Sequence, residues 1–187
     1  QLIEQYGKDK IFSGGLTVYS TLDIDAQNCA EASAAQECNG ELECALSAVD
    51  PKTGFVRAIV GGKDYNENQY NLATQGQRQP GSTFKTFTLI AAIEGDSKIA
   101  SDGTMVVDVG ISPNQIVDCY STISVDIGSN KKWVVSNANY ANYGNCTIER
   151  AFMVSSNTGF ARVIMKIGAK KVAEMAKRLG VESDLDV

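Results

Sequence analysis

Apolar residues recur at helical spacing near both ends of this 187-residue chain. In the first third, they predict an amphipathic helix over residues 24–37 with Asp23 as its N-cap. In the last third, they predict one helix that ends at Gly168 and another that ends at Gly180, because glycine commonly follows the last turn of a helix. The residues that carry these patterns are Ala26, Cys29, Ala30 and Ala34; Phe160, Val163, Ile164 and Ile167; and Val172, Met175, Ala176 and Leu179.

Alternating and β-branched runs predict strands in the first third of the chain. Residues 16–21 alternate as a half-buried strand does, and residues 45–49 and 55–60 read as two further strands. Residues 50–54, with the sequence Asp-Pro-Lys-Thr-Gly, have the composition of a hairpin turn between the last two. The polar residues 63–79 that follow are expected to form a long loop, and loops of that length are often functional.

The middle of the chain, residues 95–146, gives the weakest signal. Residues 106–109 suggest a short strand, and the remainder is expected to be an irregular excursion packed on a helical core. Order returns at Thr147, which is expected to cap a short helix through Val154. Residues 155–157 should interrupt the helices there.

The segment from Gln79 to Ile93 holds the most informative chemistry. A Pro-Gly pair breaks the preceding structure, and Ser82 after it suits an N-cap or a first helical turn. The following residues are apolar or threonine on nearly every side except at Lys85, which predicts a helix buried all round. Because Lys85 lies three residues after Ser82, the two side chains should share one helix face.

This pair suggests nucleophilic catalysis. A serine hydroxyl needs a nearby base to take its proton, and the chain contains no histidine. Burial disfavours the charged form of lysine, and the positive end of a helix acts in the same direction, so Lys85 could be a neutral base for Ser82. The alternative is a structural helix whose lysine reaches out to solvent.

Composition narrows the other possibilities. The net charge of −5 without a basic run argues against nucleic-acid binding. No run of about 18 apolar residues and no signal peptide is present, and the chain reads as an excised piece of something longer.

An S-x-x-K match is expected about once by chance in a chain of this size. The second match, Ser129 with Lys132, lies in a polar stretch that reads as a solvated turn.

The chain has five cysteines, at positions 29, 38, 44, 119 and 146. No C-x-x-C pattern and no histidine accompanies them, which argues against a zinc site. Two bridges with one cysteine left over allow fifteen connectivities, from five choices of the free cysteine and three pairings of the rest. We weakly favour the pairs 38/44 and 119/146, and free buried cysteines are the alternative.

Five segments, in order along the chain, match a known family. They are Gly15-Leu16-Thr17-Val18-Tyr19-Ser20-Thr21-Leu22-Asp23; Ala48-Val49-Asp50-Pro51-Lys52-Thr53-Gly54; Ala58-Ile59-Val60-Gly61-Gly62; Arg78-Gln79-Pro80-Gly81-Ser82-Thr83-Phe84-Lys85; and Ser155-Ser156-Asn157-Thr158. Together they resemble the first part of the transpeptidase domain of a class A penicillin-binding protein, and the similarity is weak only in residues 95–146.

The resemblance implies site residues. The family works with S-x-x-K, S-x-N and K-[ST]-G motifs. It makes Ser82 the nucleophile that forms an acyl-enzyme, Lys85 its base, and Ser155 and Asn157 the second motif, which shuttles protons and holds the substrate amide. Taken alone, Ser155 and Asn157 would be helix-capping residues, and a further S-x-N match at residues 112–114 reads as a turn.

The third motif departs from the family pattern. Lys52-Thr53-Gly54 precedes Ser82 and is interpreted as a turn, so the genuine motif is expected beyond Val187. The resemblance then implies an α+β fold, an antiparallel sheet packed with helices, whose later strands are missing. We expect a truncated transpeptidase domain: residues 1–80 form a preamble of strand, helix and hairpin, and residues 81–187 form a helical part with both motifs.

The implied function is that of a peptidoglycan D,D-transpeptidase that cross-links stem peptides and is acylated by β-lactams, without metal or organic cofactor. The intact protein is expected on the outer face of the cytoplasmic membrane, with a glycosyltransferase domain and a membrane anchor. The chain itself should acylate slowly or not at all, and an unpaired edge strand at residues 55–60 should favour self-association. The alternatives are a serine β-lactamase or D,D-carboxypeptidase, and a non-catalytic sensor module.

Overall fold

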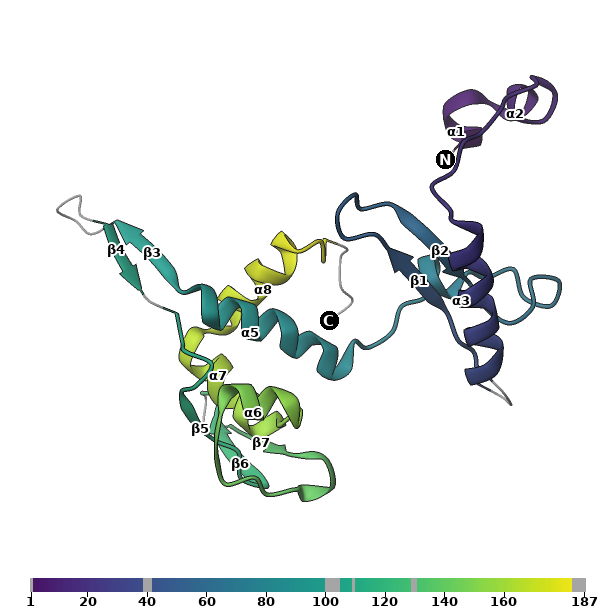
Figure 1. The fold of residues 1–187 in the computed structure, drawn as a ribbon. Coiled ribbons are helices and arrows are strands. Elements are labelled where there is room, and N and C mark those ends of the chain that lie inside the picture. Colours follow the sequence, from purple (N-terminus) through teal and green to yellow (C-terminus); the bar gives the residue numbers. More distant parts are fainter. Residues whose placement is uncertain (1, 39–41, 100–104, 109, 129–130, 183–187) are drawn as a thin grey trace. The chain divides into compact units, whose positions relative to one another are not determined.

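The computed structural model describes residues 2–38, 42–99, 105–108, 110–128 and 131–182 (Figure 1). The chain forms two compact units, residues 1–79 and residues 80–187. Both combine helices with antiparallel strand pairs, so the fold is α+β as predicted.

In the first unit, a long helix packs against a β-hairpin. The helix α3 contributes Ala30 to a small core, and the hairpin contributes Ala58 and Val60. The elements of this unit are α1 (Leu2–Tyr6), α2 (Lys8–Ser13), α3 (Ile24–Glu37), β1 (Leu46–Val49), β2 (Val56–Val60) and α4 (Leu72–Gln75).

The sequence predicted α3 and the hairpin correctly. The Asp23 side chain caps α3 by accepting a hydrogen bond from the backbone N–H of Ala26 at 3.0 Å. The strands β1 and β2 pair antiparallel, and residues 51–53 form the turn between them. Gly54 has a φ of 73°, a left-handed conformation that favours glycine, so Lys52-Thr53-Gly54 is a turn as interpreted.

Two details of the first unit differ from the prediction. Residues 16–21 do not form a strand, because none of the described strands pairs with them, and Val18 and Tyr19 are 63% and 92% exposed. The polar segment 63–79 is not entirely loop. It contains the short helix α4, which Asn71 caps by accepting from two backbone N–H groups.

The second unit consists of helices packed on short strand pairs. One of its cores joins α5, α6 and α7 through Ala92, Ile148 and Val163. The elements are the 3₁₀ helices η1 (Gly81–Phe84) and η2 (Ala138–Tyr140); the helices α5 (Lys85–Glu94), α6 (Ile148–Met153), α7 (Asn157–Ile167) and α8 (Ala169–Arg178); and the strands β3 (Asp96–Ile99), β4 (Met105–Asp108), β5 (Ile116–Asp118), β6 (Thr122–Asp126), β7 (Lys132–Ser136) and β8 (Asn145–Thr147).

The expectation of an irregular segment over residues 95–146 was wrong. Three antiparallel pairs organise it: β3 with β4, β6 with β7, and β5 with β8. The short strand predicted at 106–109 is observed as β4, although Val109 itself lies outside the described residues. Ser129 of the second S-x-x-K match also lies outside them.

The C-terminal helices agree with the prediction. Thr147 caps α6 by accepting from the backbone N–H of Arg150 at 3.1 Å. The helix α7 begins at Asn157, three residues before its apolar pattern, and ends at Ile167, with Gly168 as its C-cap. The helix α8 ends one residue before Leu179, and Gly180 follows with a φ of 97°.

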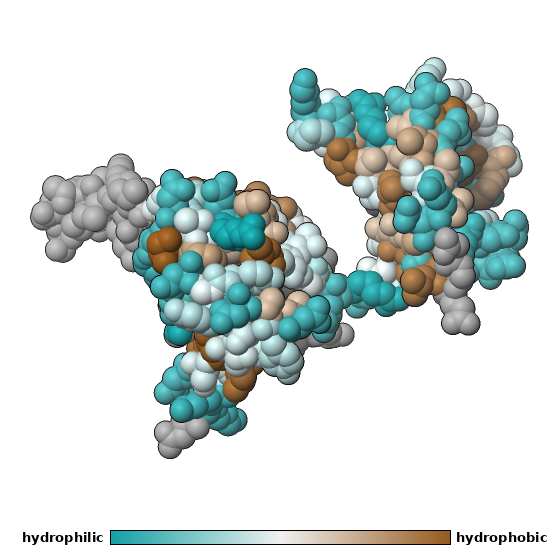
Figure 2. All heavy atoms as spheres, turned by 60° about the horizontal axis from the view of Figure 1, so that its bottom comes forward, coloured by the Kyte–Doolittle hydropathy of each residue, from teal (hydrophilic) through white to brown (hydrophobic). Residues whose placement is uncertain are grey.

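The helix α5 is not buried all round, contrary to the prediction. Thr88, Ala91 and Ala92 are buried, whereas Ile90 and Ile93 are 38% and 45% exposed. The described residues pack on one side of α5 only, so its other apolar side chains remain accessible. Exposed hydrophobic residues occur on both units (Figure 2).

Both favoured cysteine pairs are disulfides. Cys38 bonds to Cys44 and Cys119 bonds to Cys146, while Cys29 is free and exposed. In the parts of the chain that the structure describes, no helix combines the length and apolar character that a membrane crossing requires.

Candidate active site

Ser82 and Lys85 lie at the junction of η1 and α5. Lys85 Nζ is 2.9 Å from Ser82 Oγ, within hydrogen-bond distance. The 3₁₀ turn of η1 runs directly into α5, which brings the two side chains onto one face as their spacing predicted. Ser82 is exposed to solvent, and Lys85 is half-buried.

The second motif meets Lys85 from the turn between α6 and α7. Lys85 Nζ donates to Asn157 Oδ1 at 2.6 Å, and lies 3.0 Å from the Ser155 carbonyl oxygen and 3.1 Å from Ser155 Oγ. All four predicted site residues therefore converge on one amine, although 70 residues separate Lys85 from Ser155 in sequence.

The backbone at Ser155 is unusual. Its φ of 54° lies in the left-handed region, which costs a non-glycine residue about 1–2 kcal/mol. This conformation ends α6 and turns both the carbonyl oxygen and the hydroxyl of Ser155 toward Lys85. Strained backbone of this kind is often retained at functional sites.

A second hydrogen bond fixes the orientation of the Asn157 amide. Its Nδ2 donates to the backbone carbonyl of Ser136, at the end of β7, at 2.8 Å. The amide oxygen consequently faces Lys85. No motif in the sequence includes Ser136, so its part in the site was not predicted.

Burial changes the chemistry of the amine. Desolvation lowers the pKa of Lys85 from its ordinary value of 10.5, because the half-buried position disfavours the ammonium form. This is the direction that the sequence argument expected. It increases the fraction of Lys85 that is neutral at a given pH.

A cavity of about 390 Å³ lies beside the pair. Ser82, Lys85 and Asn157 supply its polar groups, and Trp133 is half exposed within its lining. The remaining walls are mostly apolar, so the cavity suits a ligand with one polar reacting group and an apolar body. Its other lining residues are Gly81, Phe84, Thr88, Val135, Phe160, Ala161 and Ile164.

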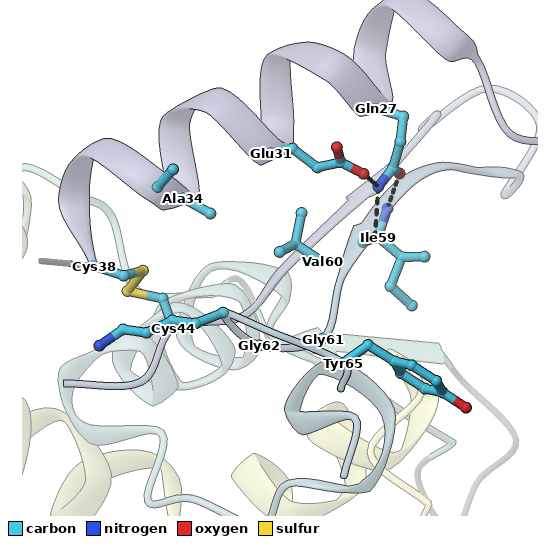
Figure 3. Close-up of a pocket in the computed structure, with 12 residues that line it drawn as sticks. Gln27, Glu31, Ala34, Cys38, Cys44, Ile59, Val60, Gly61, Gly62 and Tyr65 are labelled. Carbon is cyan, nitrogen blue, oxygen red and sulfur yellow. Dashed lines mark hydrogen bonds between the residues drawn. A yellow bond between two sulfur atoms is a disulfide. The ribbon is translucent and has the colours of Figure 1, made fainter. Parts of the chain in front are cut away.

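A larger cavity, of about 590 Å³, lies in the first unit between α3 and the end of β2 (Figure 3). The disulfide between Cys38 and Cys44 borders it, and Gln27 crosses from α3 to bond the backbone of Ile59. No serine is among its described lining residues, so this cavity does not contain the predicted nucleophile.

The other S-x-N match has a local role only. The Ser112 hydroxyl accepts from the backbone N–H of Asn114 at 3.3 Å, within a turn, as the sequence suggested.

Comparisons with known proteins indicate the family of this chain. The family described as penicillin binding protein transpeptidase domain matches residues 44–187. Penicillin-binding protein 1A of Neisseria lactamica is 36% identical over 78% of this chain and 17% of its own length. Penicillin-binding protein 2D of Bacillus subtilis is 29% identical over 95% of this chain and 24% of its own.

The solved structures of related folds include the penicillin-binding protein PonA1 from Mycobacterium tuberculosis. It has a TM-score of 0.76 and 29% identity, over 99% of this chain and 43% of that one. The structure of PonA1 in complex with penicillin V has a TM-score of 0.75 and 30% identity, over 98% of this chain and 45% of that one.

This chain spans between 16% and 24% of the curated relatives that it matches. Within that span, the ordered motifs, the fold and the family match agree. The chain belongs to the penicillin-binding protein transpeptidase domain family.

Proposed function

We propose that the chain is the nucleophile-bearing part of a peptidoglycan D,D-transpeptidase, which cross-links stem peptides through an acyl-enzyme on Ser82. The observation that carries the proposal is the convergence of Ser82, Ser155 and Asn157 on Lys85 Nζ. The similarity to a protein solved with penicillin V supports it, because β-lactams acylate the serine of such enzymes.

The contacts of Lys85 suit a general base. A neutral amine has two N–H bonds and one lone pair. Asn157 Oδ1 and the Ser155 carbonyl can accept the two N–H groups, which leaves the lone pair for the proton of the Ser82 hydroxyl.

The reaction then proceeds in two acyl transfers. Lys85 takes the hydroxyl proton as Ser82 Oγ attacks a peptide carbonyl of the donor stem, and the C–N bond breaks as the leaving amine receives a proton through Ser155. The amine of a second stem peptide attacks the ester, forms the cross-linking amide and returns a proton to Ser82. A β-lactam follows the first half only, and its opened ring remains attached to Ser82.

The chain by itself should acylate slowly. Its 187 residues hold no K-[ST]-G motif after Asn157, and Lys52-Thr53-Gly54 is the turn between β1 and β2. In this family the strand that carries the motif supplies one of the two oxyanion donors. Losing one such donor typically costs about a hundredfold to a thousandfold in rate.

We place the intact protein on the outer face of the cytoplasmic membrane, with a glycosyltransferase domain and a membrane anchor. The relatives named penicillin-binding protein 1A support this assignment. The two disulfides support it further, because disulfides persist mainly outside the reducing cytosol.

Covalent labelling tests the proposal. The intact protein incubated with a fluorescent penicillin should carry one label per molecule, Ser82→Ala should carry none, and the matched control Ser112→Ala should label as the wild type does. Labelling that persists in Ser82→Ala would refute the assignment of the nucleophile. Rapid loss of the label would instead support a β-lactamase or carboxypeptidase, and no label in the wild type would support a non-catalytic sensor.

A further inference from the structure

Three buried polar residues gather behind the second motif. Among the described residues, Asn137 is 4% exposed, and Ser156 and Thr158 are fully buried. Ser156 and Thr158 flank Asn157 in sequence, and Asn137 directly follows β7. A buried polar group is tolerated only when it is hydrogen-bonded, so the partners of Asn137 show what it holds.

The oxygen of the Asn137 amide holds both neighbours of Asn157. Asn137 Oδ1 accepts from Ser156 Oγ at 3.0 Å and from the backbone N–H of Thr158 at 3.1 Å. Ser156 Oγ also accepts from the backbone N–H of Gly159 at 3.0 Å, which caps α7. One side chain therefore fixes the first turn of the helix that carries Asn157.

The nitrogen of the same amide holds the opposite wall. Asn137 Nδ2 lies 2.9 Å from the carbonyl oxygen of Ala141, 3.1 Å from that of Tyr120 and 3.2 Å from that of Cys119. Cys119 is part of the disulfide to Cys146. Asn137 is thus anchored to the loops around β5 and η2 while it bonds the turn of the second motif.

The backbone beside Asn137 completes the arrangement. The Ser136 carbonyl, one residue earlier, accepts from Asn157 Nδ2 and so turns Asn157 Oδ1 toward Lys85. The side chain of Asn157 and the residues on either side of it are consequently tied to two consecutive residues, Ser136 and Asn137.

We propose that Asn137 is a positioning residue for the acylation of Ser82: it fixes the 155–158 turn so that Asn157 and Ser155 hold the amine of Lys85 against the nucleophile. The proposal rests on the function proposed above. It predicts that loss of the Asn137 amide slows acylation about a hundredfold without contact to the substrate, because displacements of about 1 Å in a reacting group have effects of that size.

The test uses the intact protein, fluorescent penicillin and two matched pairs of variants. Asn137→Ala removes the amide. Asn142→Ala is its control, since Asn142 is exposed and its side chain accepts from the backbone N–H of Gly144 within its own turn. Thr158→Val removes the buried hydroxyl that bonds the Tyr120 carbonyl at 2.8 Å and lies 3.2 Å from Asn137 Oδ1, and Thr158→Ser restores it.

A second readout does not depend on acylation. Reductive methylation with formaldehyde, followed at Lys85 by peptide mass spectrometry across pH, reports the titration of this amine. In Asn137→Ala the midpoint of the Lys85 methylation profile should move toward that of an ordinary exposed lysine. In Asn142→Ala this midpoint should not move.

The positioning role would be established if Asn137→Ala and Thr158→Val both label slowly and both shift the Lys85 methylation profile. The controls Asn142→Ala and Thr158→Ser should then behave as the wild type does. Unchanged labelling and an unchanged profile would overturn it, as would a loss of rate that Thr158→Ser fails to restore. If the wild type takes no label, the proposed function fails and the methylation profile alone decides the role of Asn137. If Asn137→Ala does not fold, the Thr158 pair decides it.

Discussion

Four oxygen atoms lie within hydrogen-bond distance of the Lys85 amine. It meets the hydroxyls of Ser82 and Ser155, the Ser155 carbonyl and the Asn157 amide oxygen, in a half-buried position that lowers its pKa. The spacing and setting of Ser82 and Lys85 predicted that pair, whereas Ser155 and Asn157 were predicted from the family resemblance. The sequence could not indicate that they share a single nitrogen, because that depends on how α6 and α7 pack beside α5.

Replacement of Lys85 by arginine should abolish the base while retaining the positive charge. Arginine stays protonated at any accessible pH, so acylation of the intact protein by penicillin should fall by about a hundredfold to ten-thousandfold in Lys85→Arg.

In the wild type, the acylation rate should rise with pH as Lys85 loses its proton. The midpoint of this rise should lie below 10.5, because burial lowers the pKa of Lys85.

Lys52→Arg is the matched control for this prediction. Lys52 lies in the exposed turn between β1 and β2, so its replacement should change neither the rate nor the pH profile. A flat profile in the wild type, or a wild-type rate in Lys85→Arg, would exclude Lys85 as the base.

The left-handed backbone of Ser155 allows strain and chemistry to be separated. Ser155→Gly and Ser155→Ala both remove the hydroxyl that faces Lys85, so both should slow acylation of the intact protein. Glycine tolerates a φ of 54°, whereas alanine is strained there. The free energy of unfolding should therefore be about 1 kcal/mol higher for Ser155→Gly than for Ser155→Ala. Thermal denaturation of the two variants measures the difference, and equal stability would show that the turn relaxes at no cost.

At the scale of elements, the open edge of the first unit is not the one that the sequence suggested. The outer edge of β2 is covered, because Gln27 bonds both the N–H and the carbonyl of Ile59 (Figure 3). In addition, the backbone N–H of Asp23 donates to the carbonyl of Arg57. The prediction of an exposed edge at residues 55–60 was therefore wrong, because α3 and the segment before it supply the missing bonds.

The unpaired edge belongs to β1 instead. Ser47 lies opposite Ile59, and because Ile59 directs its backbone groups away from β1, Ser47 directs its own away from β2. Ser47 is also exposed. An edge with free backbone groups invites pairing with another strand.

We expect the isolated chain to self-associate through β1, and Ser47→Pro to prevent it. Proline removes the outward N–H without breaking the β1–β2 ladder, whereas Ser47→Ala keeps the N–H and should associate as the wild type does. Sedimentation velocity over a range of concentrations measures the effect. A monomeric wild type, or association that survives Ser47→Pro, would contradict the prediction.

For the whole molecule, sequence reasoning succeeded where the signal is local. Helical spacing predicted α3, α7 and α8, the Thr147 cap predicted α6, and turn chemistry predicted the β1–β2 hairpin. It failed for residues 95–146, since the pairing of β5 with β8 joins strands of three residues that are far apart in the chain. The alternation of Thr122 to Asp126 was a usable signal for β6, whereas nothing distinguished Asn137 from its exposed asparagine neighbours.

The rate of acylation by penicillin can be compared between the isolated chain and the intact protein. Ser82, Lys85 and the second motif are assembled here, so the isolated chain should still take a penicillin label, with Ser82→Ala as its background control. Its rate should be about a hundredfold to a thousandfold below that of the intact protein, because the 187 residues hold no K-[ST]-G motif after Asn157 and the proposal assigns one of the two oxyanion donors to the strand that carries it. Time courses at equal concentrations of protein and fluorescent penicillin give the ratio. Equal rates would mean that the backbone N–H of Ser82 and the S-x-N motif stabilise the oxyanion unaided, and the role assigned to the K-[ST]-G strand would then have to be abandoned for this enzyme.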